Sequence, residues 1–196
     1  MVANSTPLPG RTAPDLSTYG ALNQPTSGRV SCEIVKDNGL ARLDFTLTKA
    51  RVPVTDGAAS GSYGTLKLFD FLEGAFSFLG CRQDYTATAE GSALTTAAGD
   101  AVYVWGVGTA AAATARDGTL TTTEQDIGTK TGTVTNAGGT GAVTAVDGAK
   151  TTALNGTATP IDLYLNWSGT AATIDANSYI DVTGTISVSF VPLGDD

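Results

Sequence analysis

The side chains with which this chain could do chemistry are few, and its 196 residues include no histidine. Histidine exchanges protons near neutral pH and is the base of the usual serine triad, so that arrangement is excluded. Two carboxylate pairs remain, Asp70 with Glu73 and Glu124 with Asp126, and glycosidases work with such a pair alone. Carboxylates beside turns are usually solvated, so we expect both pairs to be ordinary surface groups.

Patterns that bind cofactors or metal ions are incomplete in this chain. The run Gly106-Val-Gly-Thr-Ala-Ala follows an expected strand, as a dinucleotide-binding turn does, but no strand–helix–strand unit surrounds it. Asp147-Gly-Ala-Lys-Thr differs from a phosphate-binding loop because alanine separates its glycine from its lysine. Cys32 and Cys81 with carboxylates would make a weak zinc ligand set. We therefore expect no cofactor, no metal and no enzymatic activity.

The two cysteines could form a disulfide only if the fold brings them together. The N-terminus has neither a basic nor an apolar region of the kind found in secretory signals, so we expect synthesis in the cytoplasm. Because that compartment is reducing, two small buried thiols are the favoured interpretation.

The charge balance argues against nucleic acid and membrane partners. The net charge is −8, and the closest approach to a basic cluster is Lys49 with Arg51. Phosphate binding needs clustered Lys and Arg, so we expect no nucleic acid. No stretch reaches the roughly 18 apolar residues of a membrane span, so we expect no membrane contact. Charged residues make up only 15% of the chain, and threonine is the most frequent residue, which favours a neutral surface capable of hydrogen bonding.

Residues 1–28 are predicted to form an extended N-terminal arm. Their four prolines forbid a regular helix or a central strand. The arm is either a disordered tail or a segment that becomes ordered on a neighbouring molecule. In the second case its isolated apolar residues would be the anchors, namely Leu8, Leu16, Tyr19 and Leu22.

A strand pattern begins at Val30. Residues 30–34 and 43–47 alternate apolar and polar side chains, and Asp37-Asn38-Gly39 between them predicts a tight hairpin. In the run 66–71 the apolar positions change from even to odd between Leu68 and Phe69, which predicts a β-bulge.

The remaining segments complete an all-β chain. Strands are expected at 102–107, 161–167 and 180–190, and residues 120–127 form a plausible edge strand. Residues 128–156 are rich in Gly and Thr, and we interpret them as a long loop or a pair of thin exposed strands. The prediction is one jelly-roll-like antiparallel β-sandwich domain at 29–196, following the arm at 1–28.

The aromatic residues leave two interpretations open. Tyr103, Trp105, Tyr164 and Trp167 could form a face on which a sugar stacks, as in a carbohydrate-binding module. Such residues are more often core or interface aromatics. The strand with Tyr103 and Trp105 is apolar on both faces, so it is either central or packed against a partner.

Several motifs together resemble one family. They are Arg51-Val-Pro-Val-Thr-Asp-Gly, Ser60-Gly-Ser-Tyr-Gly-Thr-Leu-Lys-Leu-Phe-Asp-Phe, Glu73-Gly-Ala, Phe78-Leu-Gly, Thr123-Glu-Gln-Asp-Ile, Asn155-Gly-Thr-Ala, Leu165-Asn and Gly184-Thr-Ile. Residues 50–190 thereby resemble the decoration, or cement, proteins of tailed-bacteriophage capsids, most specifically over 60–71. The resemblance implies a jelly-roll-like fold, association into dimers or trimers, and attachment to the outside of an icosahedral shell. It carries over no catalytic residue.

The expected function is therefore that of a structural virion protein, made in the host bacterial cytoplasm and located on the outer capsid surface. Its partners would be the major capsid protein and further copies of itself. Contacts are expected at Leu8, Leu16, Tyr19, Leu22, Tyr103 and Trp105. The alternatives are a tail or fibre component, a glycan-binding β-sandwich module and, least favoured, a carboxylate-pair glycosidase.

Overall fold

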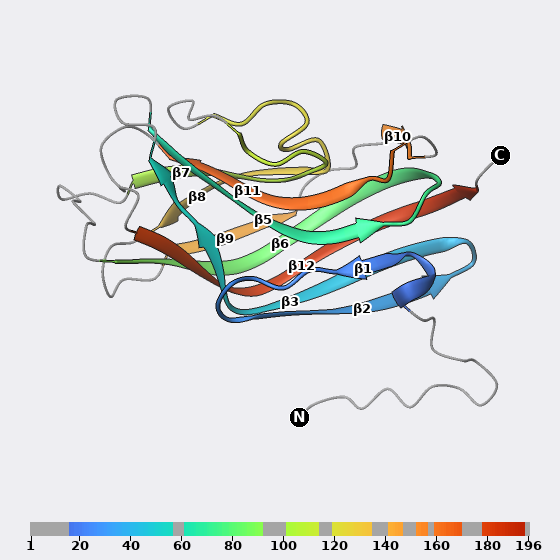
Figure 1. The fold of residues 1–196 in the computed structure, drawn as a ribbon, viewed down its shortest axis with the longest axis horizontal. Coiled ribbons are helices and arrows are strands. Elements are labelled where there is room, and N and C mark those ends of the chain that lie inside the picture. The colour runs from blue at the N-terminus through green and yellow to red at the C-terminus, as the bar shows by residue number, and fades with distance from the viewer. Residues whose placement is uncertain are drawn as a thin grey trace.

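The computed structural model describes residues 16–56, 61–91, 101–113, 119–134, 141–146, 152–156, 159–169 and 178–194. Antiparallel strands dominate these residues and form two sheets packed face to face (Figure 1). The elements are η1 (Leu16–Thr18), β1 (Gly20–Leu22), β2 (Arg29–Asp37), β3 (Leu40–Pro53), β4 (Thr55–Asp56), β5 (Ser62–Phe71), β6 (Ala75–Gly91), β7 (Ala101–Gly108), β8 (Gly128–Val134), β9 (Gly141–Val146), β10 (Thr152–Asn155), β11 (Asp162–Gly169) and β12 (Ser178–Gly194). The predicted all-β sandwich is confirmed.

The strand order is that of a jelly roll. Sheet A has the order β1-β5-β11-β7-β8, with β4 beside β5, and sheet B has the order β10-β6-β12-β3-β2, with β9 beside β6. Within them, β3-β12-β6-β9 faces β5-β11-β7-β8. Numbered along the chain, these eight strands are 1-8-3-6 opposite 2-7-4-5, the double Greek key of the jelly roll.

Two local predictions are confirmed in the backbone. Asp37 pairs with Leu40, and Asn38 and Gly39 between them have φ angles of 47° and 85°, as a two-residue hairpin turn requires. The bulge is also present, because Leu163 pairs with Phe69 and Tyr164 with Lys67, which leaves Leu68 as the extra residue.

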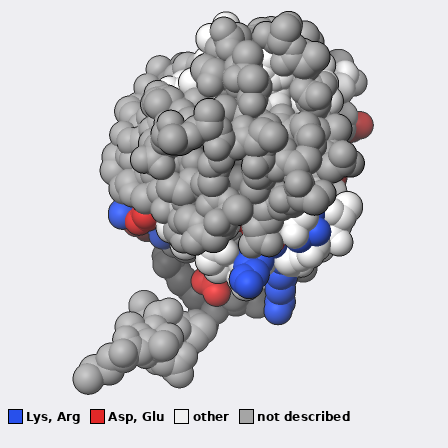
Figure 2. Space-filling view, turned by 90° about the vertical axis from the view of Figure 1, so that its left-hand side faces the viewer, with Lys and Arg blue, Asp and Glu red and all other residues white. Residues whose placement is uncertain are grey.

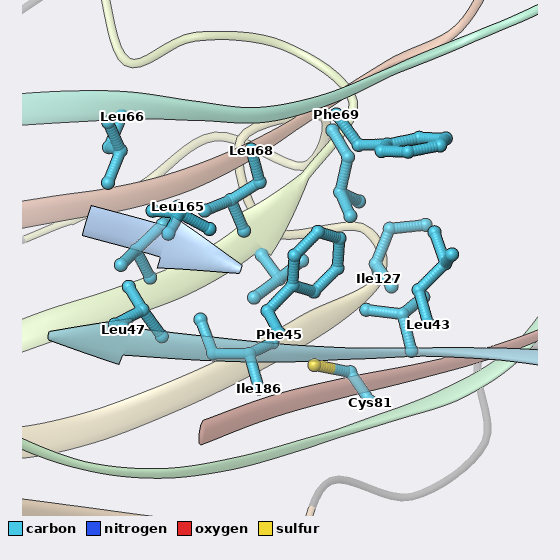
Figure 3. Close-up of a cluster of buried hydrophobic side chains, with 14 of the residues drawn as sticks. Leu43, Phe45, Leu47, Leu66, Leu68, Phe69, Cys81, Ile127, Leu165 and Ile186 are labelled. Atoms are coloured by element: carbon cyan, nitrogen blue, oxygen red, sulfur yellow. The ribbon is translucent and has the colours of Figure 1, made fainter. Parts of the chain in front are cut away.

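The core lies between the sheets. Figure 3 shows Leu43, Phe45 and Leu47 of β3 opposite Leu66 and Leu68 of β5. Each such side chain contributes about 1.5–3 kcal/mol when it leaves water. Edge-to-face aromatic contacts continue the core, as where Phe71 lies 5.3 Å from Phe190 between ring centroids. Because both sheets contribute, the sandwich is one packed body.

The structure decides between the two interpretations of residues 128–156 and corrects the one for residues 120–127. Residues 128–134, 141–146 and 152–155 are strands, so the strand interpretation of the Gly/Thr-rich stretch is right for the part that the structure describes. Residues 120–127 are a succession of turns instead of an edge strand, with Leu120 and Ile127 buried. Among the described residues, no helix has the length and apolar character needed to cross a membrane.

Candidate partner-binding surface

Two of the six expected contact residues belong to the core of this chain. Trp105 is fully buried, with its ring 5.4 Å from Tyr85 and 6.3 Å from Trp167 between centroids. Tyr19 is buried against Phe190, 5.7 Å away. Trp105 therefore presents no exposed surface, whereas Tyr19 keeps 8% of its surface exposed. The sequence could not reveal this for Trp105, because its strand is apolar on both faces.

The other expected contacts lie at the edge of the core or outside the described part. Leu16 and Leu22 are partly buried and pack against the core. Leu8 lies outside the described residues, and so does the side chain of Tyr103, although its backbone pairs with Gly169.

The segment 16–28, here called the N-terminal strap, belongs to the sandwich. Its strand β1 pairs with the edge of β5, where the N–H of Leu72 donates to the carbonyl of Tyr19 at 2.8 Å. The strap then reaches β2, where the Gln24 side chain donates to the Val30 carbonyl at 2.7 Å and accepts from the Val30 N–H at 3.1 Å. The strap thus bridges the two sheets, and of the expected arm only residues 1–15 lie outside the described residues.

The carboxylates Glu124 and Asp126 are buried, contrary to the expectation of surface groups. Asp126 accepts hydrogen bonds from the N–H and the hydroxyl of Thr109, at 2.9 and 2.8 Å. Glu124 accepts from the N–H of Thr121 at 2.6 Å. Each carboxylate therefore satisfies backbone donors at a turn, which is a structural role.

Asn166 fastens this turn region to the outer face of sheet A. Its side-chain amide donates to the carbonyls of Ala110 and Glu124, both at 2.8 Å. Its side-chain oxygen accepts from the N–H of Ala112 at 3.0 Å and from the Thr65 hydroxyl at 2.7 Å. All four of its bonds join chain segments far apart in sequence.

Gly106 and Gly108, which suggested a dinucleotide-binding turn, have a packing role instead. A Cβ atom on Gly108 would lie 2.3 Å from the carbonyl carbon of Glu124, and one on Gly106 would lie 2.7 Å from Gln125. Only glycine lets the turn region approach β7 this closely.

Asp70 does not pair with Glu73. Its carboxylate forms an ion pair with Lys67 and accepts a 2.8 Å hydrogen bond from Asn23 of the strap. Burial opposes ionisation, but these hydrogen bonds hold the pKa of Asp70 below its usual value. Lys67 also contacts Asp162 at 3.0 Å, so the cluster ties β5, β11 and the strap together.

Cys32 and Cys81 do not form a disulfide, and Cys81 is buried whereas Cys32 is half-buried. Burial, together with the nearby charges of Asp44 and Glu33, raises the pKa of Cys32 from 9.0 to about 12. Among the described residues, no group of three Cys, Asp or Glu side chains could hold a metal ion.

The exposed large apolar side chains of the described residues gather at one end. They are Val35, Leu40, Leu72 and Leu193, which are 44%, 38%, 51% and 53% exposed, and we call this set the apolar end. Val35 and Leu40 flank the β2–β3 turn, Leu72 lies in the β5–β6 turn, and Leu193 ends β12. These three places adjoin at the right of Figure 1. Clustered exposed apolar side chains commonly mark a protein-binding surface.

A hollow of about 200 Å³ lies at the apolar end. Its lining includes Tyr19 of the strap, Leu72, Phe76 and Pro192. The strap therefore enters the sandwich directly beside the exposed apolar residues.

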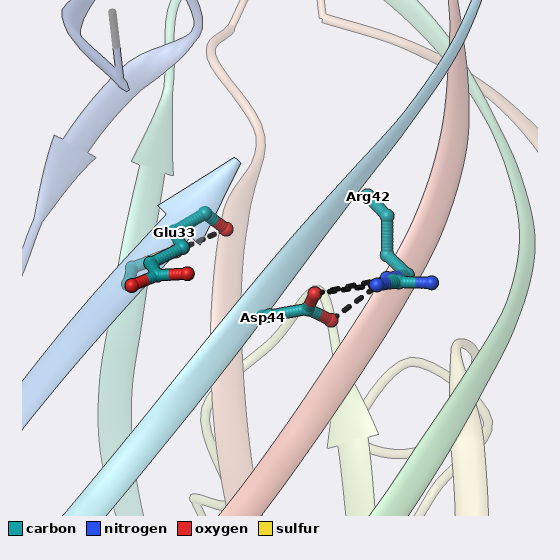
Figure 4. A network of polar contacts seen from close by, with 4 residues as sticks. Glu33, Arg42 and Asp44 are labelled. Carbon is teal, nitrogen blue, oxygen red and sulfur yellow. Dashed lines mark hydrogen bonds and ion pairs between the residues drawn. The ribbon is translucent and has the colours of Figure 1, made fainter. Parts of the chain in front are cut away.

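A larger hollow of about 660 Å³ lies on the outer face of sheet B and is here called the sheet B hollow. It is lined by Leu40, Arg42, Leu79, Arg82, Ser187 and Ser189, among others. Arg42 is held by Asp44 beside Glu33 (Figure 4), with guanidinium–carboxylate distances of 2.7–3.0 Å. At the opposite end of the long axis from the apolar end, the visible charged side chains gather along the lower edge (Figure 2).

Comparison of the chain with protein-family models, with curated proteins and with solved structures finds no match.

Proposed function

We propose that this chain is a structural virion protein that binds the outside of an icosahedral phage capsid and cements neighbouring major capsid subunits. The observation that carries the proposal is the apolar end, where exposed Leu72 and Leu193 flank the point at which the strap enters the sandwich. The choice of the major capsid protein as the partner rests on the motif resemblance to capsid decoration proteins.

Because a capsid shell repeats the same subunit many times, a modest interface with each subunit is sufficient for stable attachment. A standard protein interface buries about 1,600 Å² in total, and smaller contacts are usually transient. On a shell, a cement protein that is itself oligomeric touches several identical subunits, and each further contact is intramolecular with a high effective concentration. A well-packed sandwich suits this role because it holds its contact residues in fixed positions.

The carbohydrate-binding alternative loses its main support. Trp105 and Trp167 are fully buried, so neither ring can stack on a sugar. The Tyr164 hydroxyl donates to Asp162 at 2.8 Å, which places this ring within the Lys67 cluster.

Binding to undecorated capsids tests the proposal. Purified protein is mixed with capsids and sedimented, and the bound fraction is measured over a range of concentrations. The wild type is expected to co-sediment and to saturate at a fixed number of copies per capsid. The double variant Leu72→Asp, Leu193→Asp should bind at least about tenfold more weakly, because it places charge in an apolar contact.

Thr48→Asp is the matched control. Thr48 is exposed on β3, well away from the apolar end, so this variant adds one carboxylate without touching the proposed contact. Wild-type protein that stays in the supernatant at all concentrations would refute the function. Electron microscopy of labelled virions separates capsid binding from a place in the tail or fibre.

A further inference from the structure

The net negative charge of this chain lies almost entirely outside the strands of its two sheets. The strands of sheet B hold six of the eleven Lys and Arg residues, namely Arg29, Lys36, Arg42, Lys49, Arg51 and Arg82. The same strands hold six carboxylates, namely Glu33, Asp37, Asp44, Asp84, Glu90 and Asp181. Sheet B is therefore neutral, and the net charge of −8 belongs to the rest of the chain. An acidic partner surface would be repelled least by sheet B.

The register of sheet B places two arginines on opposite sides of a hydroxyl row. On the outer face, Ser189 of β12 lies between Arg42 of β3 and Gly80 of β6. Ser187 lies between Asp44 and Arg82 in the same way. Because Gly80 has no side chain, the sheet B hollow opens beside Ser189, between the two cationic positions.

The two arginines differ in how firmly they are held. Arg42 makes short hydrogen bonds to Asp44 through two of its nitrogens. The closest approach of Arg82 to Asp84 is 3.6 Å, and the Arg82 side chain is 65% exposed. Such an exposed pair contributes about 0–1 kcal/mol, so a partner carboxylate could take the place of Asp84 at little cost. A guanidinium binds a carboxylate through two parallel hydrogen bonds.

The rim of the sheet B hollow joins it to the apolar end. Leu40 belongs to both, and Leu79 lines the same hollow from β6. The hollow, whose charged lining residues are Arg42, Arg82 and Asp44, thus meets the apolar end at Leu40 on the outside of sheet B.

We infer that the sheet B hollow binds an acidic segment of the capsid subunit, with a carboxylate held by Arg82 and the hydroxyl of Ser189. The Ser187 hydroxyl is not part of this contact, because it is already bonded to Asp44. Aliphatic side chains of the same segment pack on Leu40 and Leu79. The inference rests on the proposed function and names the part of the capsid surface that the protein recognises, which is acidic and aliphatic.

The test compares two charge reversals on one sheet. Arg82→Glu lies in the hollow, and Arg29→Glu, the matched control, is exposed on β2 next to Thr48, away from the hollow. Both change the net charge equally, so they share any long-range effect on association. Capsid affinity is measured by co-sedimentation at low and moderate salt, after thermal unfolding confirms that each variant is folded. Arg82→Glu is expected to weaken binding about tenfold or more and to reduce the salt dependence, whereas Arg29→Glu changes affinity less than about threefold.

The outcomes separate the inference from the function. If the wild type binds capsids and the two variants bind equally well, the hollow is not the contact, while the proposed function stands. If the wild type does not bind at all, both are refuted. If Arg82→Glu alters only self-association in sedimentation velocity, the occupant is a second copy of this chain and the inference is wrong.

Discussion

Buried polar side chains in this protein act on the backbone of its own loops. Asn166, Glu124 and Asp126 each bond main-chain groups of residues 109–113 or 120–124, and all three are buried. A buried polar atom that loses its partner costs about 1–3 kcal/mol, so such side chains fix one loop conformation. Residue types that suggest chemistry in the sequence are thus used for architecture.

Replacing Asn166 tests this directly. Asn166→Ala leaves the N–H of Ala112 and the carbonyls of Ala110 and Glu124 without their side-chain partner. We expect the free energy of unfolding to fall by about 3 kcal/mol, measured by urea denaturation. Thr46→Ala, an exposed change on β3, should alter it by less than about 0.5 kcal/mol. Equal values for both variants would mean that the turn region is not held by Asn166.

The Cys32 thiol should be unreactive in the folded protein. A pKa raised from 9.0 to about 12 lowers its thiolate fraction at pH 8 roughly a thousandfold, since each pKa unit is a factor of ten. Iodoacetamide at pH 8, followed by mass spectrometry of the peptides, measures the labelling rate. Labelling of Cys32 in the native protein as fast as in urea would contradict this environment.

At the scale of elements, the strap couples the two sheets. β1 extends sheet A beside β5, Tyr19 fills the core near Phe190, and Gln24 bonds the backbone of β2. The strap is therefore a structural element of the sandwich, and an arm that ends at residue 28 would include it.

Two deletions distinguish these boundaries. Removing residues 1–28 takes away Tyr19 and strand β1, so we expect a loss of at least about 3 kcal/mol of stability, the cost of truncating one large buried aromatic. Removing residues 1–15 keeps Tyr19 and strand β1, so this truncated protein should retain the stability that they contribute. Equal melting temperatures for the two truncated proteins would show that the strap contributes nothing.

The strap should loosen in acid. Hydrogen bonds from Lys67 and Asn23 outweigh burial and depress the pKa of Asp70. A depressed carboxyl pKa stabilises the fold above the unfolded-state value near 3.8 and loses that contribution as the pH falls through the folded-state value. The Asp70→Asn variant should therefore lose up to about 1 kcal/mol at pH 7 and show a flatter acid limb in chemical denaturation. If the stability of Asp70→Asn depended on pH in the same way as that of the wild type, the stabilising role of the Lys67–Asp70 cluster would be contradicted.

Local elements could be predicted from sequence, whereas their arrangement could not. The Asn38-Gly39 turn and the bulge at Leu68 depend only on neighbouring residues, so both can be predicted from the local sequence pattern. The pairing of β12 with both β3 and β6 depends on contacts more than 85 residues apart, and the alternating pattern does not say which strands pair. Residues 120–127 form turns whose backbone groups bond one another and the backbone of Val107, Thr109 and Ala110, so they lack the strand that their composition suggested.

The apolar end could not be predicted from the sequence for the same reason. Leu72 and Leu193 are single apolar residues in a turn and near a terminus, and only the strand order brings them to one end with Val35 and Leu40. In contrast, Trp105 was predicted to contact a partner because its strand is apolar on both faces. The turn region that covers the strand at Gly106 and Gly108 could not be predicted from that pattern.

At the scale of the whole molecule, the interior and the outer surface of the sandwich have different roles. The interior between the sheets is filled by aromatic and aliphatic side chains, which makes a rigid body. Among the described residues, the exposed large apolar side chains form the apolar end, and the strands of sheet B carry equal numbers of basic and acidic residues. If the proposed partner surface is acidic and aliphatic, these two features determine the orientation in which the protein binds it.

The central claim is that this protein stabilises an assembled capsid, and the heat resistance of capsids measures it most directly. Undecorated capsids are heated with and without saturating protein, and the temperature at which a DNA-binding dye enters packaged particles is recorded. The account predicts a clear rise in that temperature with the wild type and little rise with the Leu72→Asp, Leu193→Asp variant. Identical opening temperatures with and without the wild-type protein, at concentrations that saturate the particles, would contradict it.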